Sequence, residues 1–216
     1  MAAEIGLRER KKQRTRELLA DTARRQFSER GFENVSVAEI ARLADVSQAT
    51  VFNYFPTKED LVYSGLEEFE ESLFAAIRER PRGQTVLEAF RDFILTARGF
   101  LAAEDEKQAE ELVAVTRMIA ASPALLAREQ QIFARTTDAL AELIAKDTGA
   151  GPADSRPHVA ANALIGVHRA LIAYVRQRLE AGTPTRSRLA RDVRERGKQA
   201  FALLAAGLGD YAPKRP

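Results

Sequence analysis

The chain has 216 residues, of which 45% are hydrophobic and 30% are charged, so it can bury a core and keep a polar surface. It contains no cysteine, which excludes disulfides, thiolate nucleophiles and cysteine-based metal sites and fits a cytoplasmic location. The formal net charge is only +2, so a contact with nucleic acid would need a local concentration of basic residues.

The first predicted element carries such a concentration. Apolar residues recur at helical spacing along nearly the whole chain, which predicts an all-α fold of about nine helices. The first helix should run from Arg8 to Arg30, where Gly31 stops it. Six lysines and arginines lie between residues 8 and 16. Because cations oppose the macrodipole at a helix N-terminus, helix stability does not explain them. They form either a solvated leader or a basic arm that contacts DNA.

Two short helices come next. Ser36 and Glu39 have the spacing of a capping box, which predicts a helix from there to about Ala44. Ser47 can cap a third helix, Gln48–Tyr54. Two short helices joined by a tight turn are typical of a helix-turn-helix, whose second helix enters the major groove.

The pattern of apolar residues predicts longer helices in the rest of the chain. A fourth helix should begin at Thr57, and the following five are predicted at Thr85–Ala103, Lys107–Ala121, Pro123–Lys146, Arg156–Glu180 and Thr185–Ala206. We expect residues 1–60 to form the DNA-binding domain with its basic arm, and residues 61–216 a ligand-binding and dimerisation domain. The most apolar stretch, Val159–Val175, is too short for a comfortable membrane span, so we interpret it as a buried helix and expect no membrane partner.

Three stretches, Phe27–Phe32, Val37–Ala41 and Val46–Leu61, include a short helix that ends in Tyr-Phe and is followed by Lys-Glu. Through these stretches, residues 14 to 63 resemble the DNA-binding domain of the TetR (tetracycline repressor) family. The resemblance implies a homodimer that reads a palindromic operator in double-stranded DNA. It also implies a left-handed turn at Asp45, where relatives often carry glycine, and aspartate tolerates that conformation.

The resemblance assigns roles to individual residues. It implies phosphate contacts for Ser36, Tyr54 and Lys58 and groove-facing positions for Gln48, Ala49, Thr50 and Asn53. The complete predicted DNA-contacting set is Arg14, Arg16, Ser36, Ser47, Gln48, Ala49, Thr50, Phe52, Asn53, Tyr54 and Lys58. Phe52 stands where many relatives have tyrosine, so a hydroxyl contact is lost while packing on a base methyl or sugar remains. Tyr54 could instead pack on the first helix.

The C-terminal half predicts a buried helix and a dimer interface. The helix Arg156–Glu180 is apolar nearly all round, which is typical of a helix between two layers. In a TetR-like chain this helix and the last one pack against their copies in the partner subunit. The residues predicted for that interface are Val167, Leu171, Tyr174, Val193, Phe201 and Leu204.

The middle helices predict an effector pocket. Candidate ligand-binding residues are Phe69, Phe90, Phe93, Arg117, Met118, Phe133, Asn162, Ile165 and His168, because such pockets are apolar with a few polar anchors. For Arg117, Asn162 and His168 an internal hydrogen bond or salt bridge is the alternative. The stretch Arg117–Arg128 resembles a TetR subgroup that includes the mycofactocin-cluster regulator, which implies an acyl-CoA-like effector.

These features predict a repressor that a small apolar or amphipathic ligand releases from its operator. A ligand-independent DNA-binding protein of the same fold, or an activator, remains the alternative. An enzyme is disfavoured, because His158 and His168 lie on different faces of one helix and the chain shows no phosphate loop or nucleophile motif. We expect no cofactor and no metal.

Overall fold

The computed structural model describes residues 6–96, 106–182 and 185–208. Within these ranges the chain forms nine α-helices and one 3-10 helix and no strand, which confirms the all-α prediction. The chain divides into two compact units. The first comprises the residues up to Leu66 together with Met118–Leu126, and the second comprises Glu67–Arg117 and the residues from Ala127 onward.

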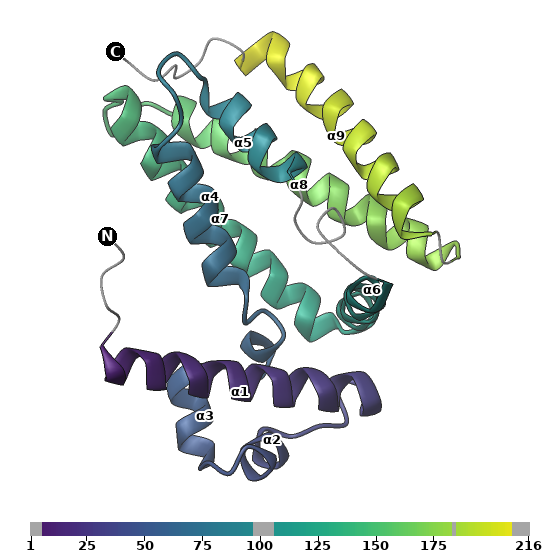
Figure 1. Ribbon diagram of the computed structural model, residues 1–216. Coiled ribbons are helices and arrows are strands. Elements are labelled where there is room, and N and C mark those ends of the chain that lie inside the picture. The colour runs from purple at the N-terminus through teal and green to yellow at the C-terminus, as the bar shows by residue number, and fades with distance from the viewer. Residues whose placement is uncertain (1–5, 97–105, 183–184, 209–216) are drawn as a thin grey trace. The chain divides into compact units, whose positions relative to one another are not determined.

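The first unit is a small helical domain built on one long helix. Helix α1 (Leu7–Arg30) lies across α2 (Val37–Leu43) and α3 (Gln48–Tyr54), and the 3-10 helix η1 (Glu59–Leu61) also packs on α1 (Figure 1). Its core consists of apolar side chains that are at most 5% exposed, namely Leu19, Ala23, Phe27, Phe32, Val35, Ile40, Ala41, Val51, Phe55 and Leu61. Burial of these side chains fixes α2 and α3 on α1.

The turns of this unit follow the predicted backbone. Gly31 ends α1 with φ 82°, and its N–H donates to the carbonyl of Phe27 at 2.9 Å. Between α2 and α3, Asp45 has φ 54°, and among the described residues it is the one non-glycine with a positive φ. The left-handed turn expected at Asp45 is therefore confirmed.

Helix α1 begins at Leu7, one residue before its predicted start, so the basic segment is helical in its described part. One predicted boundary needs correction. The fourth helix does not begin at Thr57. There the Thr57 N–H donates to an Asp60 carboxylate oxygen at 3.0 Å and nucleates only the 3-10 turn, and α4 (Leu66–Arg78) starts after Gly65. Glycine is a poor helix former, which separates the two elements.

The second unit contains the longer helices. They are α4, α5 (Val86–Leu95), α6 (Glu106–Ala121), α7 (Pro123–Thr148), α8 (Arg156–Glu180) and α9 (Arg186–Leu208). The end of α6 and the start of α7 belong to the first unit. Helix α5 ends at Leu95, and the remainder of the helix predicted to Ala103 lies outside the described residues.

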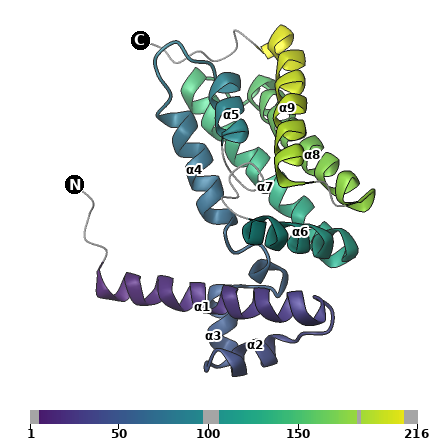
Figure 2. The ribbon, with the colours of Figure 1, turned by 45° about the vertical axis from the view of Figure 1, so that its right-hand side comes forward.

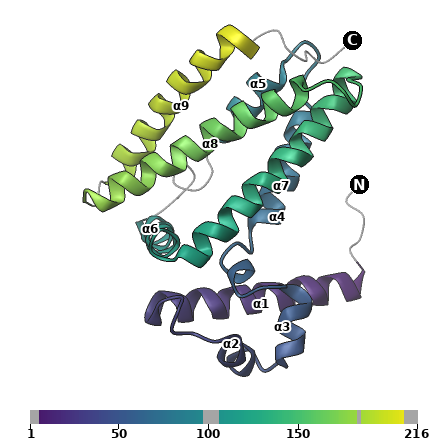
Figure 3. The same ribbon diagram turned by 180° about the vertical axis from the view of Figure 1, so that it is seen from behind.

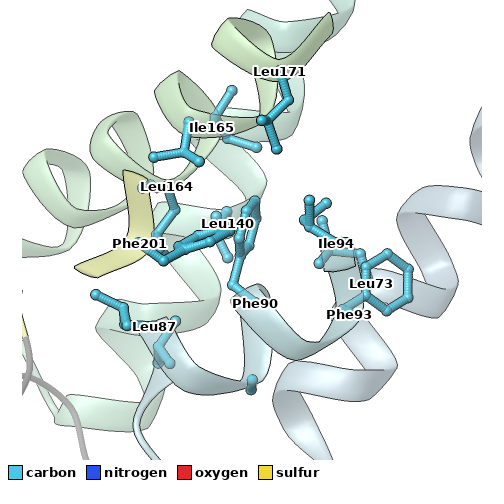
Figure 4. Packing of buried hydrophobic residues seen from close by; sticks show 14 of the residues in the cluster. Leu73, Leu87, Phe90, Phe93, Ile94, Leu140, Leu164, Ile165, Leu171 and Phe201 are labelled. Carbon is cyan, nitrogen blue, oxygen red and sulfur yellow. The ribbon is translucent and has the colours of Figure 1, made fainter. Parts of the chain in front are cut away.

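The core of the second unit lies where α5, α8 and α9 meet. Helices α8 and α9 run antiparallel and side by side, and α5 packs against both (Figures 2 and 3). Phe90 of α5 and Phe201 of α9 are at most 1% exposed, with ring centroids 6.1 Å apart (Figure 4). Helix α9 comes close to α5 at Gly197, where a Cβ atom would collide with the side chain of Leu95.

Helix α8 is buried along one face and not on all sides as predicted, because Val159 is 60% exposed and Gly166, Ala170 and Ala173 are also exposed. Its mean hydropathy of 1.2 over 18 residues would allow a membrane crossing by length and composition alone. Leu164, Ile165 and Leu171 of this helix lie in the core of the second unit, as Figure 4 shows. The packing explains the apolar composition without a membrane.

Candidate functional site

Helix α3 presents a polar face to solvent while its other face is buried. Val51 is fully buried and Phe55, its C-cap, is 1% exposed, so the helix is anchored along one side. The predicted groove-facing residues Gln48, Ala49 and Asn53 are exposed, and Thr50 is half-buried. Phe52 is 46% exposed, which is unusual for a large apolar side chain. The side chains on this face have the chemistry to read base edges and thymine methyl groups.

The serines that open α2 and α3 serve as helix caps. The Ser36 hydroxyl accepts from the Glu39 N–H at 3.2 Å, and the Ser36 N–H donates to the Glu39 carboxylate at 3.0 Å. This backbone bond, with further bonds from Arg30 and the Ser36 hydroxyl, lowers the pKa of Glu39 to about 2. The Ser47 hydroxyl accepts from the Thr50 N–H at 3.0 Å. Both serines therefore satisfy backbone donors that helix starts leave free.

Arg16 and Lys58 are engaged inside the first unit. An Arg16 guanidinium nitrogen donates to the carbonyl of Tyr54 at 3.1 Å, and the guanidinium lies 4.6 Å from the centre of the Phe55 ring. The Lys58 ammonium donates to the carbonyl of Phe32 at 2.6 Å and lies 4.1 Å from the centre of that ring. Burial lowers the pKa of Lys58 from its ordinary value. Both cations thus hold the domain together, whereas Arg14 is exposed and Tyr54 is half-buried.

The first unit also contains two long-range bonds that the sequence patterns did not indicate. The Tyr63 hydroxyl donates to the carbonyl of Leu125 at 2.9 Å, and the Ser122 hydroxyl donates to the Glu33 carboxylate at 2.7 Å. Ser122 is 3% exposed. These bonds attach the α6–α7 corner, defined here as Met118–Leu126, to the turn after α1 and to the turn after η1. No local periodicity signals a bond between residues 62 or 89 positions apart.

The second unit brings four predicted ligand residues together. Phe69 of α4 lies 5.4 Å from Phe93 of α5 and 5.5 Å from the imidazole of His168 of α8, measured between ring centroids. Phe133 of α7 meets the same imidazole at 5.9 Å with its ring nearly perpendicular. We call Phe69, Phe93, Phe133 and His168 the aromatic cluster. Rings at these separations attract one another.

The imidazole of His168 lies in an apolar environment. Burial lowers the pKa of its imidazole from 6.5 to about 4, which means that protein surrounds the ring. The residue nevertheless keeps part of its surface accessible to water, as do Phe69 and Phe133. Phe90, by contrast, is completely buried.

The other predicted ligand residues lie elsewhere. Phe90 and Ile165 are at most 2% exposed and fill the tight core. Arg117 is exposed, Met118 belongs to the first unit, and the exposed Asn162 amide donates to the carbonyl of His158 at 2.8 Å. A ligand role for these residues stays a prediction that the described contacts do not support.

The residues predicted for the dimer interface are largely covered within the protomer. Val167, Leu171, Val193 and Phe201 are at most 8% exposed, and Leu204 packs on the same core. The Tyr174 hydroxyl donates to Asp192 of α9 at 3.4 Å. The apolar stripes of α8 and α9 thus meet each other, and their part in a dimer stays a prediction.

A salt bridge between Arg176 and Glu129 joins α8 to α7. Arg176 of α8 donates two bonds, of 2.9 and 2.6 Å, to the Glu129 carboxylate of α7, and both side chains are at most 17% exposed. Such bidentate pairs are the stronger class of charged hydrogen bond. Among the described residues, no group of three or more histidine, aspartate or glutamate side chains converges in a way that could hold a metal.

Comparison with known proteins matches both halves of the chain. Residues 19–63 match the model of the bacterial regulatory proteins of the tetR family, and residues 84–209 match the MftR C-terminal domain. The chain is 29% identical over 146 residues to the HTH-type transcriptional regulator TcmR of Streptomyces glaucescens, covering 67% of this chain and 65% of TcmR, just under two thirds.

Two further similarities extend over more of the chain. It is 26% identical over 165 residues to the mycofactocin biosynthesis transcriptional regulator MftR of Mycobacterium tuberculosis, covering 76% of this chain and 80% of that protein. The solved structure of a SmeT–triclosan complex superposes with a TM-score of 0.56 at 19% identity, covering 92% of this chain and 95% of SmeT. The last similarity concerns the fold alone.

The internal bonds of Lys58 generate the first prediction. Replacing Lys58 with Met should lower the unfolding free energy by about 1–2 kcal/mol, because the bond to Phe32 is lost. It should leave the salt dependence of DNA binding unchanged, since a cation that touches no phosphate releases no counterion. The measurements are urea unfolding and binding titrations at several salt concentrations.

The exposed cations of α1 provide the matched comparison for that experiment. Replacing Arg8, Arg10, Lys11 and Lys12 together with Gln should weaken binding and flatten its salt dependence by roughly one unit of slope per lost phosphate contact. A flattened slope in Lys58→Met would restore the phosphate role predicted from the resemblance. An unchanged slope in the glutamine variant would remove α1 from the DNA contacts.

The depressed pKa of His168 generates the second prediction. In the unfolded chain the His168 imidazole becomes protonated below about pH 6.5, whereas in the folded protein its pKa is about 4. The unfolding free energy should therefore fall as the pH falls through this window. The loss between pH 7 and pH 5 should be on the order of 2 kcal/mol. Urea unfolding at both pH values should show that His168→Phe lacks this loss, while His158→Gln, on the same helix, keeps it. An equal loss in both variants would contradict the assignment.

Proposed function

Because the chain belongs to the TetR family of bacterial regulatory proteins and carries an MftR-type C-terminal domain, we propose that it is a dimeric repressor released from its operator by a small ligand. The observation that carries the proposal is helix α3, whose exposed face offers Gln48, Ala49 and Asn53 while Val51 and Phe55 anchor it. The protein would act in the cytoplasm, where its DNA is.

The coarser assignment does not depend on the ligand. The family and both curated relatives are DNA-binding transcriptional regulators, which confirms the prediction of a regulator over that of an enzyme. The groove-facing side chains divide the recognition task. Gln48 and Asn53 can pair with adenine in the major groove, and the exposed ring of Phe52 can pack on a thymine methyl or a sugar. Arg14 and the cations of α1 would neutralise phosphates.

A dimer is supported by what one α3 helix can read. A single seven-residue helix contacts few base pairs, whereas two copies on a two-fold axis read a palindrome with centres about 34–36 Å apart or a multiple of that. On α8, Val159 is 60% exposed and shares one helix face with the exposed small residues Gly166, Ala170 and Ala173. We propose that this face, and not the buried stripe, meets the partner subunit.

The effector would enter the second unit at the aromatic cluster. The resemblance to the mycofactocin-cluster regulators favours an amphipathic, acyl-CoA-like ligand, and SmeT, which shares the fold, forms a complex with triclosan. The acyl chain of such a ligand would be apolar, which agrees with a site lined by Phe69, Phe93 and Phe133. An apolar ligand gains affinity by displacing water from such a surface.

Release would proceed as a population shift. Phe133 of the aromatic cluster lies on α7, and the same helix begins with the α6–α7 corner, which Tyr63 and Glu33 bind in the first unit. A ligand that favours another setting of α7 would therefore bias the position of the corner and with it that of α3. The shift can be no larger than the difference between the affinities of the ligand for the two states.

Selection of bound fragments from random DNA tests the central proposal. The full-length protein should enrich a palindromic sequence at moderate salt. Gln48→Ala and Asn53→Ala should relax the preference at single positions, each costing about 1–3 kcal/mol, because each removes a base contact. The folded Ser28→Ala variant, altered on an exposed part of α1, serves as the control. Enrichment of no sequence by a folded protein would overturn the proposal.

The two hydrogen bonds that the α6–α7 corner makes with Tyr63 and Glu33 generate a separate prediction. With the selected operator and a ligand that releases it in a screen, Tyr63→Phe and Ser122→Ala should bind operator normally but respond less to ligand. Loss of one hydrogen bond of about 1 kcal/mol should reduce the effect of ligand on operator affinity by up to about fivefold. Fluorescence anisotropy of labelled operator measures both quantities. Unchanged release in both variants would exclude these bonds from the coupling.

A further inference from the structure

A basic cavity lies between α8 and α9, apart from the aromatic cluster. It has a volume of about 420 Å³ and lies near the end of the pair where α8 ends and α9 begins (Figure 3). Its polar lining comes from both helices, namely Tyr174, Gln177 and Arg178 of α8 and Arg188, Asp192 and Arg196 of α9. We propose that this cavity binds a molecule that carries a diphosphate group. The inference concerns a second site and goes beyond the proposed function.

The charge of the lining provides the first argument. Three guanidinium groups and one carboxylate line the cavity, so its formal charge is +2. Within the part of the chain that the structure describes, none of these three guanidinium groups forms a salt bridge. Elsewhere in the second unit, by contrast, Arg80 is paired with Asp147 and Arg176 with Glu129. Like charges around one space repel each other, and a bound anion would remove this repulsion.

The environment of Arg178 provides the second argument. Its side chain is half-buried, and its Nε is buried and has no hydrogen-bond partner among the described residues. A cation that is partly removed from water attracts an anion more strongly than a fully hydrated one does, because the effective dielectric constant around it is lower. Guanidinium groups also match phosphate oxygens with two parallel hydrogen bonds, so phosphate is the anion that suits this lining.

The spacing of the cations favours two phosphates over one. Arg188 and Arg196 lie eight residues apart on α9, which is on the order of 12 Å along the helix axis. The Arg196 guanidinium lies 4.2 Å from the centre of the Tyr174 ring, and the hydroxyl of that tyrosine donates to Asp192 at 3.4 Å. A diphosphate presents two anionic groups to cations at different positions along α9, and a single phosphate presents one. The cavity volume lies within the range of about 300–1,000 Å³ that is usual for small-molecule sites.

Three probes test the proposal in calorimetric titrations of the full-length protein at pH 7 and low ionic strength, without divalent cations. We expect pyrophosphate and ADP to bind with one site per chain, and inorganic phosphate to bind about tenfold more weakly because it lacks the second anionic group. Equal affinities for pyrophosphate and ADP would identify the bare diphosphate as the group that is bound, and tighter binding of ADP would add its organic part; both results support the proposal. Binding of neither, as expected if a partner subunit covered the cavity, or equal affinity for inorganic phosphate would overturn it.

Variants of α9 test the lining of the cavity. Arg188→Gln should weaken pyrophosphate binding about tenfold, because it removes a charged hydrogen bond, and Arg188→Lys should restore only part of the affinity, because an ammonium group lacks the paired donors. Both variants alter an exposed side chain, so the core stays intact. Arg191→Gln is the matched control, since Arg191 is exposed on the same helix but does not line the cavity. An equal loss in Arg188→Gln and Arg191→Gln would show a general attraction to a basic helix and contradict the proposal.

The basic segment of α1 is the other place where a phosphate compound could bind. The variant in which Arg8, Arg10, Lys11 and Lys12 are all replaced with Gln should therefore keep the affinity of the wild type for pyrophosphate. Loss of pyrophosphate binding in this variant would assign the anion to α1 and refute the site between α8 and α9.

Discussion

The structure of the first unit depends on keeping a seven-residue helix in place. A helix as short as α3 is not stable in water by itself, because nucleation is costly and few bonds repay it. It is held by burial of Val51 and Phe55, by the Ser47 cap and by Arg16 at its C-terminal end. A cation at that end also interacts favourably with the macrodipole. The polar side chains of Gln48 and Asn53 remain exposed to solvent on the other face of the helix.

The second unit combines two kinds of packing. Around Phe90 and Phe201 the side chains are almost completely buried, and this region joins α5, α8 and α9 as one rigid block. Around Phe69 and His168 the side chains are surrounded but incompletely covered. A protein that takes up a ligand needs the second kind of packing, and it needs the first kind nearby so that a displaced helix moves as a body.

The sequence predicted most of the fold and part of the candidate site. Capping residues and the left-handed Asp45 are local signals, so the short helices could be placed from the chain alone. An apolar stripe identifies a buried face but not the partner that buries it, so the stripes of Leu171 and Phe201 alone could not show that these side chains pack inside the protomer. Likewise the resemblance gave Lys58 a role in DNA binding, whereas its contact with Phe32 depends on tertiary packing.

The α6–α7 corner makes the first unit non-local in the sequence. Glu33 and Tyr63 find their partners at Ser122 and Leu125, so a fragment that stops at Leu66 would leave both side chains without these bonds. During synthesis the chain emerges from its N-terminus, and domains generally fold in that order. Here the reading domain is complete only after the ribosome has translated more than half of the protein. In a nascent or truncated chain, the domain that carries α3 therefore lacks the hydrogen bonds to Ser122 and Leu125.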